Sequence, residues 1–323
     1  GFTTLTAPAT KPKSLTASAI TTTTLTLSWA LPDSNGGMAI NDYRVEVSGN
    51  GGTTWTAISH IPSYSPGFLV NNLAKGKTYK FRVAAITSVG LGAYSDVYTA
   101  TTTVSVPSAP TVLTVRGITG NGVGLTWKAS SDSGGSPIYD YQIEVTRAGE
   151  DNWILIEHPE SITKTYAVNG LTPGVSYQVR VSAVNAAGYS EFAETVFTTA
   201  VVKPTAPLNL DAPDVRSSGV TLAWSLPESN GGANLTDYKV EVSSNCSTYT
   251  AITHPTSNSL GFDVINLAAG TKYCFRVSAK NTVGYSVPSE VLQVVTLGNA
   301  PAAPTALRVS NKSKTSEIGR ASC

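Results

Sequence analysis

The chain has 323 residues, and its 22 basic and 21 acidic side chains leave a formal net charge of +1 at pH 7. Only 13% of the residues are charged, and no basic patch or stripe of the kind that marks nucleic-acid-binding proteins is visible. No apolar stretch approaches the roughly 20 residues that a membrane-spanning helix needs. Thr, Ser, Val and Gly abound and helix-forming runs are absent, which favours strands joined by glycine and proline turns.

The first recurring element is an alternating apolar run that ends in tryptophan. In its first copy it reads Leu25-x-Leu27-x-Trp29, and alternation with a period of two predicts a strand with one buried face. The run returns at intervals of 98 and 97 residues, and its three copies end at Trp29, Trp127 and Trp224. Self-similarity at a fixed interval predicts a tandem array of one structural unit.

Two further elements follow the tryptophan in each copy. A Gly-Gly turn leads into a second alternating run, and a Leu-x-x-Gly-x-x-Tyr motif leads into a third. The tyrosines that open this third run are Tyr79, Tyr177 and Tyr273. Together with a glycine turn and a last strand, each copy contains seven short strands in fewer than 100 residues. This pattern predicts an all-β fold of tandem seven-stranded antiparallel sandwiches.

At this point the motifs resemble the fibronectin type III family. The tryptophan, the tyrosine motif and the segments Phe81-Arg82-Val83, Val179-Arg180-Val181 and Phe275-Arg276-Val277 carry the resemblance, which covers roughly residues 7–298. It implies an immunoglobulin-like sandwich in which the tyrosine hydroxyl bonds back to the main chain. The implied structural core residues are Trp29, Trp127, Trp224, Tyr79, Tyr177 and Tyr273. Residues 51–56 are also similar to type III modules of bacterial secreted proteins, so we expect bacterial-type secreted or surface repeats.

Proline-bearing linkers set the predicted domain boundaries. Because proline restricts the backbone, we expect these linkers to be short, stiff joints. The expected organisation is the end of a preceding repeat (1–6), three repeats (7–104, 105–201 and 202–298), and a linker with the first strand of a truncated fourth repeat and a tail (299–323).

Two of the three cysteines fall in the third repeat. Cys246 lies in the turn after the third strand, and Cys274 follows Tyr273 at the start of the sixth strand. These strands are antiparallel neighbours in the family fold, and Cys274 should point outward, so we predict a Cys246–Cys274 disulfide. A cysteine pair in one small domain favours an oxidising compartment, hence an extracellular, secreted or cell-surface location. Cys323 is expected to be free or to form an intermolecular link.

No constellation of side chains indicates catalysis or metal binding. The three histidines, His60, His158 and His254, occupy one position of the repeat, and successive repeats place them roughly 30–35 Å apart. They therefore cannot share a metal ion. We predict no catalytic residue, no metal, no cofactor and no enzyme activity. The histidines are interpreted as polar strand ends, with a pH-sensing contact at a domain junction as the alternative.

A row of aromatic residues is the candidate for partner contact. Trp55, Trp153 and Tyr249 share one repeat position, and such rings can stack on sugars or on a protein partner. In the alternative interpretation each ring covers the outer face of its own sheet.

We therefore predict a non-catalytic extracellular structural or adhesive segment, acting as a stiff spacer or filament building block on a cell surface. The alternatives are a carbohydrate-binding or accessory linker array of a secreted polysaccharide-degrading enzyme, and a viral or phage surface fibre. Expected partners are other repeats of the same protein or surface proteins, and carbohydrate in the alternative. No nucleic acid and no membrane span are expected for this segment. This functional prediction rests on analogy with other proteins of the same fold.

Overall fold

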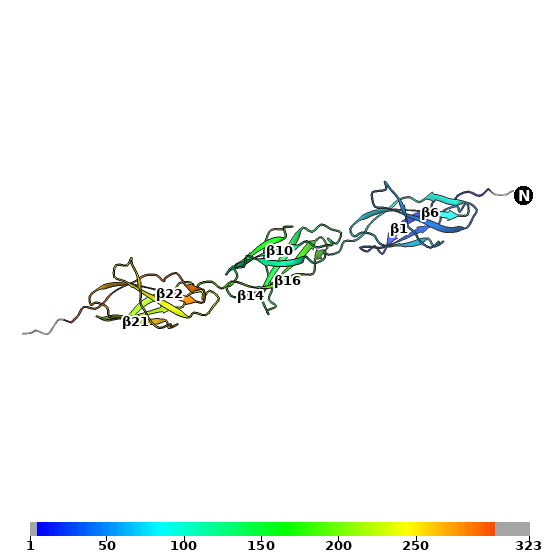
Figure 1. The fold of residues 1–323 in the computed structure, drawn as a ribbon. Helices are drawn as coiled ribbons and strands as arrows, with labels where there is room; N and C mark the ends of the chain where they lie inside the picture. The colour runs from blue at the N-terminus through cyan, green and yellow to red at the C-terminus, as the bar shows by residue number, and fades with distance from the viewer. Residues whose placement is uncertain (1–4, 301–323) are drawn as a thin grey trace, which may run out of the picture. The chain divides into compact units, whose positions relative to one another are not determined.

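A computed structural model describes residues 5–300 of the chain (Figure 1). Every regular element in this range is a β-strand, and the predicted all-β fold of antiparallel sheets is confirmed. The first two repeats belong to one compact unit that ends at Ala200, and the third repeat belongs to a second unit that begins at Val201. Most of the expected preceding repeat end, the fourth-repeat strand and Cys323 lie outside the described residues.

The first repeat contains eight strand segments in two sheets. They are β1 (Lys13–Ser18), β2 (Leu25–Ala30), β3 (Ile40–Ser48), β4 (Thr56–Ala57), β5 (Gly67–Val70), β6 (Thr78–Thr87), β7 (Gly90–Tyr94) and β8 (Tyr98–Thr101). One sheet has the order β1-β2-β5 and the other the order β4-β3-β6-β7. Strand β8 also pairs with β6, so β7 and β8 are two segments of the seventh strand.

The second repeat has the same topology. Its segments are β9 (Thr111–Arg116), β10 (Gly122–Lys128), β11 (Asp140–Arg147), β12 (Ile154–Leu155), β13 (Thr165–Asn169), β14 (Ser176–Asn185), β15 (Gly188–Tyr189) and β16 (Ala193–Thr198). The sheets are β13-β10-β9 and β12-β11-β14-β15, and β16 pairs with β14.

The third repeat, in the second unit, repeats this arrangement. Its segments are β17 (Leu208–Val215), β18 (Gly219–Ser225), β19 (Asp237–Ser243), β20 (Thr250–Ala251), β21 (Gly261–Ile265), β22 (Lys272–Asn281), β23 (Gly284–Tyr285) and β24 (Leu292–Val295). The sheets are β17-β18-β21 and β20-β19-β22-β23, and β24 pairs with β22.

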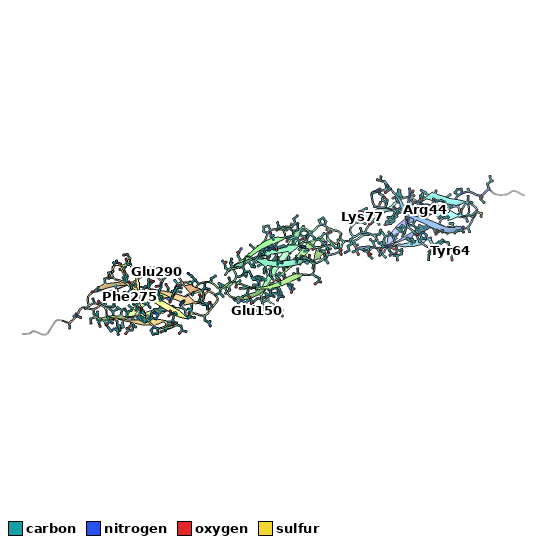
Figure 2. The ribbon with its side chains drawn as sticks, in the orientation of Figure 1. Arg44, Tyr64, Lys77, Glu150, Phe275 and Glu290 are labelled. Atoms are coloured by element: carbon teal, nitrogen blue, oxygen red, sulfur yellow. A yellow bond between two sulfur atoms is a disulfide. The ribbon has the colours of Figure 1, made fainter. Side chains whose placement is uncertain are left out.

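The core of each repeat lies between its two sheets, because the inward positions of the paired strands are apolar. In the first repeat β3 and β6 place Tyr43 opposite Ala85 and Val45 opposite Val83, and all four side chains are buried. Phe275 of β22, which corresponds to Phe81 of β6, is likewise fully buried in the third repeat (Figure 2). Trp29, Trp127 and Trp224 are each 6% exposed and pack against Tyr43, Tyr141 and Tyr238, with ring centroids 5.1, 5.4 and 5.3 Å apart.

The tyrosine of the Leu-x-x-Gly-x-x-Tyr motif fastens the turn that precedes it. The hydroxyl of Tyr79 accepts a hydrogen bond of 2.9 Å from the backbone N–H of Ala74, five residues earlier. The same bond runs from Thr172 to Tyr177 (3.0 Å) and from Ala268 to Tyr273 (3.1 Å). Tyr177 is buried, and Tyr79 and Tyr273 are half-buried, so each ring contributes to the core while its hydroxyl holds the turn.

Candidate functional site: the arginine–aromatic face of each repeat

The four-stranded sheet of each repeat carries an arginine on its outer face. In β6, Phe81 and Val83 point into the core, and side chains alternate along a strand, so Arg82 points outward. Its guanidinium lies 4.4 Å from the ring centroid of Trp55 and 4.0 Å from that of Tyr94. The arginine is thus held between two aromatic rings, which we call the arginine–aromatic face.

The second and third repeats hold the equivalent arginine in a similar way. Arg180 lies 3.9 Å from the ring of Trp153 and 4.0 Å from that of Phe192. Arg276 lies 4.0 Å from the ring of Tyr249. Each such contact is worth about 0.5–2 kcal/mol, depending on how far it is shielded from water.

A glutamate on the neighbouring strand completes the face. Glu46 of β3 is 4% exposed and accepts hydrogen bonds from Arg82 (2.8 Å), Arg44 (2.8 Å) and the hydroxyl of Tyr94 (2.7 Å). Burial raises the pKa of Glu46, but the bonds from Tyr94, Arg82 and Arg44 together outweigh it, so the net pKa lies below the ordinary value. The carboxylate therefore stays ionised, and Tyr94, whose own pKa is raised by burial and by Glu46, stays a donor.

Glu144 and Glu241 hold the equivalent arginines of the other repeats. Glu144 accepts from Arg180 at 2.5 Å, and Glu241 accepts from Arg276 at 2.9 Å. Burial raises the pKa of Glu241, and the bonds from Arg276 and Lys239 lower it further than burial raises it.

The candidate contact residues Trp55, Trp153 and Tyr249 are accordingly half-buried, and each lies against an arginine of its own repeat. This is the arrangement of the alternative interpretation, in which each ring covers the outer face of its sheet. Contact of these rings with a sugar or a protein partner stays a prediction. The sequence prediction used the Phe-Arg-Val segment only to recognise the family, so it assigned the arginine no contact of its own.

The predicted pair of cysteines in the third repeat is bonded in the structure. Cys246 and Cys274 form a disulfide with a Cα separation of 5.2 Å. Cys274 pairs with Ser243 between β22 and β19, so the turn after β19 passes directly beside it. Cys274 points away from the sandwich core, as predicted. It is nevertheless 0% exposed, because this turn covers it.

The histidines make their contacts inside their own repeats. The rings of His60, His158 and His254 pack against Phe68, Tyr166 and Phe262, with centroids 4.9, 5.2 and 5.1 Å apart. Each Nδ1 atom lies 2.8–2.9 Å from the carbonyl oxygen of the following residue. Each histidine lies three residues beyond the end of β4, β12 or β20, so the interpretation as strand ends is wrong in position. The contacts within each repeat give the junction alternative no support.

A cavity of 380 Å³ lies beside His158 in the second repeat and is lined by Trp127, Tyr141 and Tyr166. The indole N–H of Trp127 has no hydrogen-bond partner, but neither have those of Trp29 and Trp224. The unpaired indole is therefore a property of the fold and does not indicate a ligand. Among residues 5–300, no three His, Cys, Asp or Glu side chains converge as a metal site would require. In the same range no helix is long and apolar enough to cross a membrane.

The joint between the first and second repeats carries direct contacts. Lys75, in the turn before β6, donates to Asp132 at 2.6 Å and to the hydroxyl of Ser105 at 3.2 Å. Asp132 also accepts from the N–H of Gly134, as expected of a turn residue. The bond from Lys75, followed by that from Gly134, lowers the pKa of Asp132. No pattern in the sequence indicates this pair, because its two members are 57 residues apart.

Comparison with known proteins settles the family. The fibronectin type III domain matches residues 10–101, 108–199 and 205–295. The chain belongs to the fibronectin type III family. Titin of Drosophila melanogaster is 32% identical over 287 residues, which are 86% of this chain and 2% of titin. Human myomesin-2 is 28% identical over 301 residues (90% of this chain, 20% of myomesin-2), and striated-muscle M-protein of Gallus gallus is 29% identical over 270 (80% and 18%).

The chain thus spans a fifth or less of each of these relatives. Among solved structures, that of chicken CNTN1 FN1–FN3 domains covers 90% of this chain and 100% of its own, with 21% identity and a TM-score of 0.41.

The relatives correct two predictions. They are animal proteins, so the bacterial-type assignment is not supported. They are also muscle proteins, including M-protein of striated muscle, and this contradicts the predicted extracellular, secreted or cell-surface location. The location was inferred from the cysteine pair. Two cysteines on adjacent strands show that the backbones are close, which is a property of the fold and not of a compartment.

Proposed function

We propose that this segment is a non-catalytic structural element that acts as a stiff spacer or filament building block. The tandem fibronectin type III repeats and their similarity to titin and myomesin-2 suggest a structural or linker role. The observation that carries the stiffness is the joint between the first two repeats, where side chains and backbone of both repeats are in contact.

Backbone contacts at this joint leave little room for bending. The N–H of Gly76 donates to the carbonyl of Thr103 at 3.1 Å, which ties the chain leaving the first repeat back onto that repeat. A methyl group added at Gly76 would lie 2.1 Å from the carbonyl oxygen of Gly135, so the turns of the two repeats approach as closely as backbones can. Lys75 bridges the same gap to Asp132. Bending at the joint would have to break these contacts together.

Distance measurement between spin labels tests the stiffness. Thr53 and Glu150 are exposed, lie on different repeats of the first unit, and are suited to labelling through cysteine in a Cys323→Ser background (Glu150 is labelled in Figure 2). Pulsed electron resonance should give one narrow distance distribution. A broad distribution, comparable with that of a version with a glycine-serine insertion after Thr103, would contradict the proposal.

Carbohydrate contact through Trp55, Trp153 and Tyr249 remains the alternative. Titration with cellulose- and xylan-derived oligosaccharides, followed by tryptophan fluorescence, tests it. A saturable change that is lost in Trp55→Ala and Trp153→Ala would support this alternative, and no change would leave the rings as covers of their own sheets.

A further inference from the structure

The segment ahead of the first strand of each repeat is hydrogen-bonded to the rest of that repeat. Ser105 donates its backbone N–H to the carbonyl of Gly134 at 2.8 Å, and Ser108 donates to that of Asp132 at 2.9 Å. The third repeat has the same two bonds, from Val202 to Gly231 (2.8 Å) and from Thr205 to Ser229 (2.9 Å), and the first has them from Ala7 to Gly36 (3.1 Å) and from Thr10 to Ser34 (2.9 Å). We call residues 7–10, 105–108 and 202–205 the docked segments.

The first glycine of each Gly-Gly turn makes room for the docked segment. Gly36, Gly134 and Gly231 have φ angles of 71–73°. A methyl group at these positions would lie 1.7–2.0 Å from the carbonyl oxygen of Ala7, Ser105 or Val202. Only glycine satisfies both the left-handed backbone and this close approach. The Gly-Gly turn is therefore a docking surface as well as a connection between strands.

A buried asparagine fastens the docked segment in two of the repeats. Asn185, at the end of β14, donates its side-chain amide to the carbonyl of Ser105 (2.8 Å) and to that of Ser133 in the Gly-Gly turn (2.7 Å). Asn281 makes the same two bonds to Val202 (2.6 Å) and Asn230 (2.9 Å). Both asparagines are 1% exposed. Each amide thus bridges the docked segment and the turn that receives it.

The first repeat has Thr87 at this position. The hydroxyl of Thr87 accepts from the N–H of Val89, just as the side-chain oxygen Oδ1 of Asn185 accepts from the N–H of Ala187. Threonine therefore reproduces the bond that holds the turn after the strand. Thr87 has no amide group, so the bond that Asn185 and Asn281 donate to the docked segment has no counterpart between Thr87 and Ala7.

From this we infer that each repeat has a binding site for an extended peptide, formed by the Gly-Gly turn and the end of the sixth strand, and that Asn185 and Asn281 lock the preceding linker into it. The site recognises an extended segment that presents an N–H and a carbonyl at one residue and a second N–H three residues later. The occupant is the linker of this chain. The first repeat keeps the site without the asparagine, and its docked segment is held instead by the N–H of Ala93, which donates to the carbonyl of Ala9 at 3.1 Å. This inference does not depend on the proposed function.

Amide hydrogen exchange of the full chain, resolved by NMR, tests the inference. In the native chain, Ser105, Ser108, Val202 and Thr205 give the reference exchange rates, because the amides of Asn185 and Asn281 hold their segments. Loss of the buried hydrogen bonds made by one such group weakens a local structure enough to raise exchange about tenfold.

Threonine substitution separates the lock from the turn. Asn185→Thr keeps the acceptor for Ala187 and removes the amide, so exchange at Ser105 and Ser108 should rise about tenfold while Val202 and Thr205 stay unchanged. Asn281→Thr should give the reverse, so each variant is the control for the other. Exchange at Val181 and Val277, in the centres of the core strands, reports whether the repeats remain folded. Unchanged protection of Ser105 and Ser108 in Asn185→Thr would overturn the inference.

A gain of protection gives an independent test. Thr87→Asn should install the missing lock and slow exchange at Ala7 and Thr10, with Ser105 and Val202 as internal references. No slowing, with the core of the first repeat intact, would show that the asparagine does not act as a lock.

Discussion

Glu46 has a different environment from an ordinary surface glutamate. Its side chain is almost fully buried, and it accepts hydrogen bonds from Arg44, Arg82 and the hydroxyl of Tyr94. Its carboxylate is the acceptor that keeps the guanidinium of Arg82 between Trp55 and Tyr94. Loss of this acceptor would leave donors without partners on a partly buried face, which is the costly case for a hydrogen-bonded group.

We therefore expect Glu46→Gln to destabilise the first repeat by about 1–3 kcal/mol at pH 7. The folded-state pKa of Glu46 is lowered, so the stability it contributes is present above the unfolded pKa of about 4.3 and is lost as the pH falls through the folded value. Urea unfolding of the first repeat, followed by its NMR signals, should show the difference between native chain and variant shrink below pH 4. A difference that is constant from pH 7 to pH 3 would exclude this role for the charge.

At the scale of single elements, the two glycines of the Gly-Gly turn have different structural roles. Gly36 and Gly37 both have left-handed backbone angles, but only Gly36 faces the docked segment, and nothing lies within 4 Å of a methyl group placed on Gly37. Gly36→Ala should therefore destabilise the first repeat and expose residues 7–10 to exchange. Gly37→Ala is the matched control, with only the backbone strain of about 1–2 kcal/mol. Similar exchange at Ala7 in both variants would show that the close approach is unimportant.

The disulfide connects the turn after β19 to β22 and crosses 28 residues of sequence. In the chain-entropy model, closing a loop of this size stabilises the third repeat by about 3–4 kcal/mol. Non-reducing mass spectrometry should find no alkylatable thiol at Cys246 or Cys274. Reduction, or the double substitution to serine, should lower the unfolding midpoint of the third repeat and leave the first two unchanged, since they contain no cysteine. Two free thiols in the non-reduced protein would rule the bridge out.

At the scale of the whole molecule, the joint between the first two repeats combines an exposed ion pair with backbone contacts. Lys75 and Asp132 are partly exposed, so their attraction is screened by salt. We expect Lys75→Ala to broaden the distance distribution between labels at positions 53 and 150, and 1 M salt to broaden that of the native chain in the same way. Lys77→Ala, in the same turn but not bonded to the second repeat, is the control. If neither 1 M salt nor Lys75→Ala changes the width of the distance distribution, the ion pair does not contribute to the stiffness, and the backbone contacts alone account for it.

The sequence by itself determined the repeat, the fold class and the position of the core. Alternation with a period of two specifies which side chains enter the sandwich, and Trp29 and its two copies are buried because that pattern is local. The disulfide also followed from the sequence, because the family topology makes the strands that carry Cys246 and Cys274 neighbours.

Only the tertiary structure decided what surrounds the outward residues. Arg82 and Glu46 are 36 residues apart, Lys75 and Asp132 are 57 apart, and Asn185 reaches a linker 80 residues before it. No periodic pattern couples such pairs, since each depends on which turn faces which strand end after folding. The predicted extracellular location was wrong because it was inferred from the cysteine pair. Such a pair shows that folding brings two backbones close together and carries no information about the compartment.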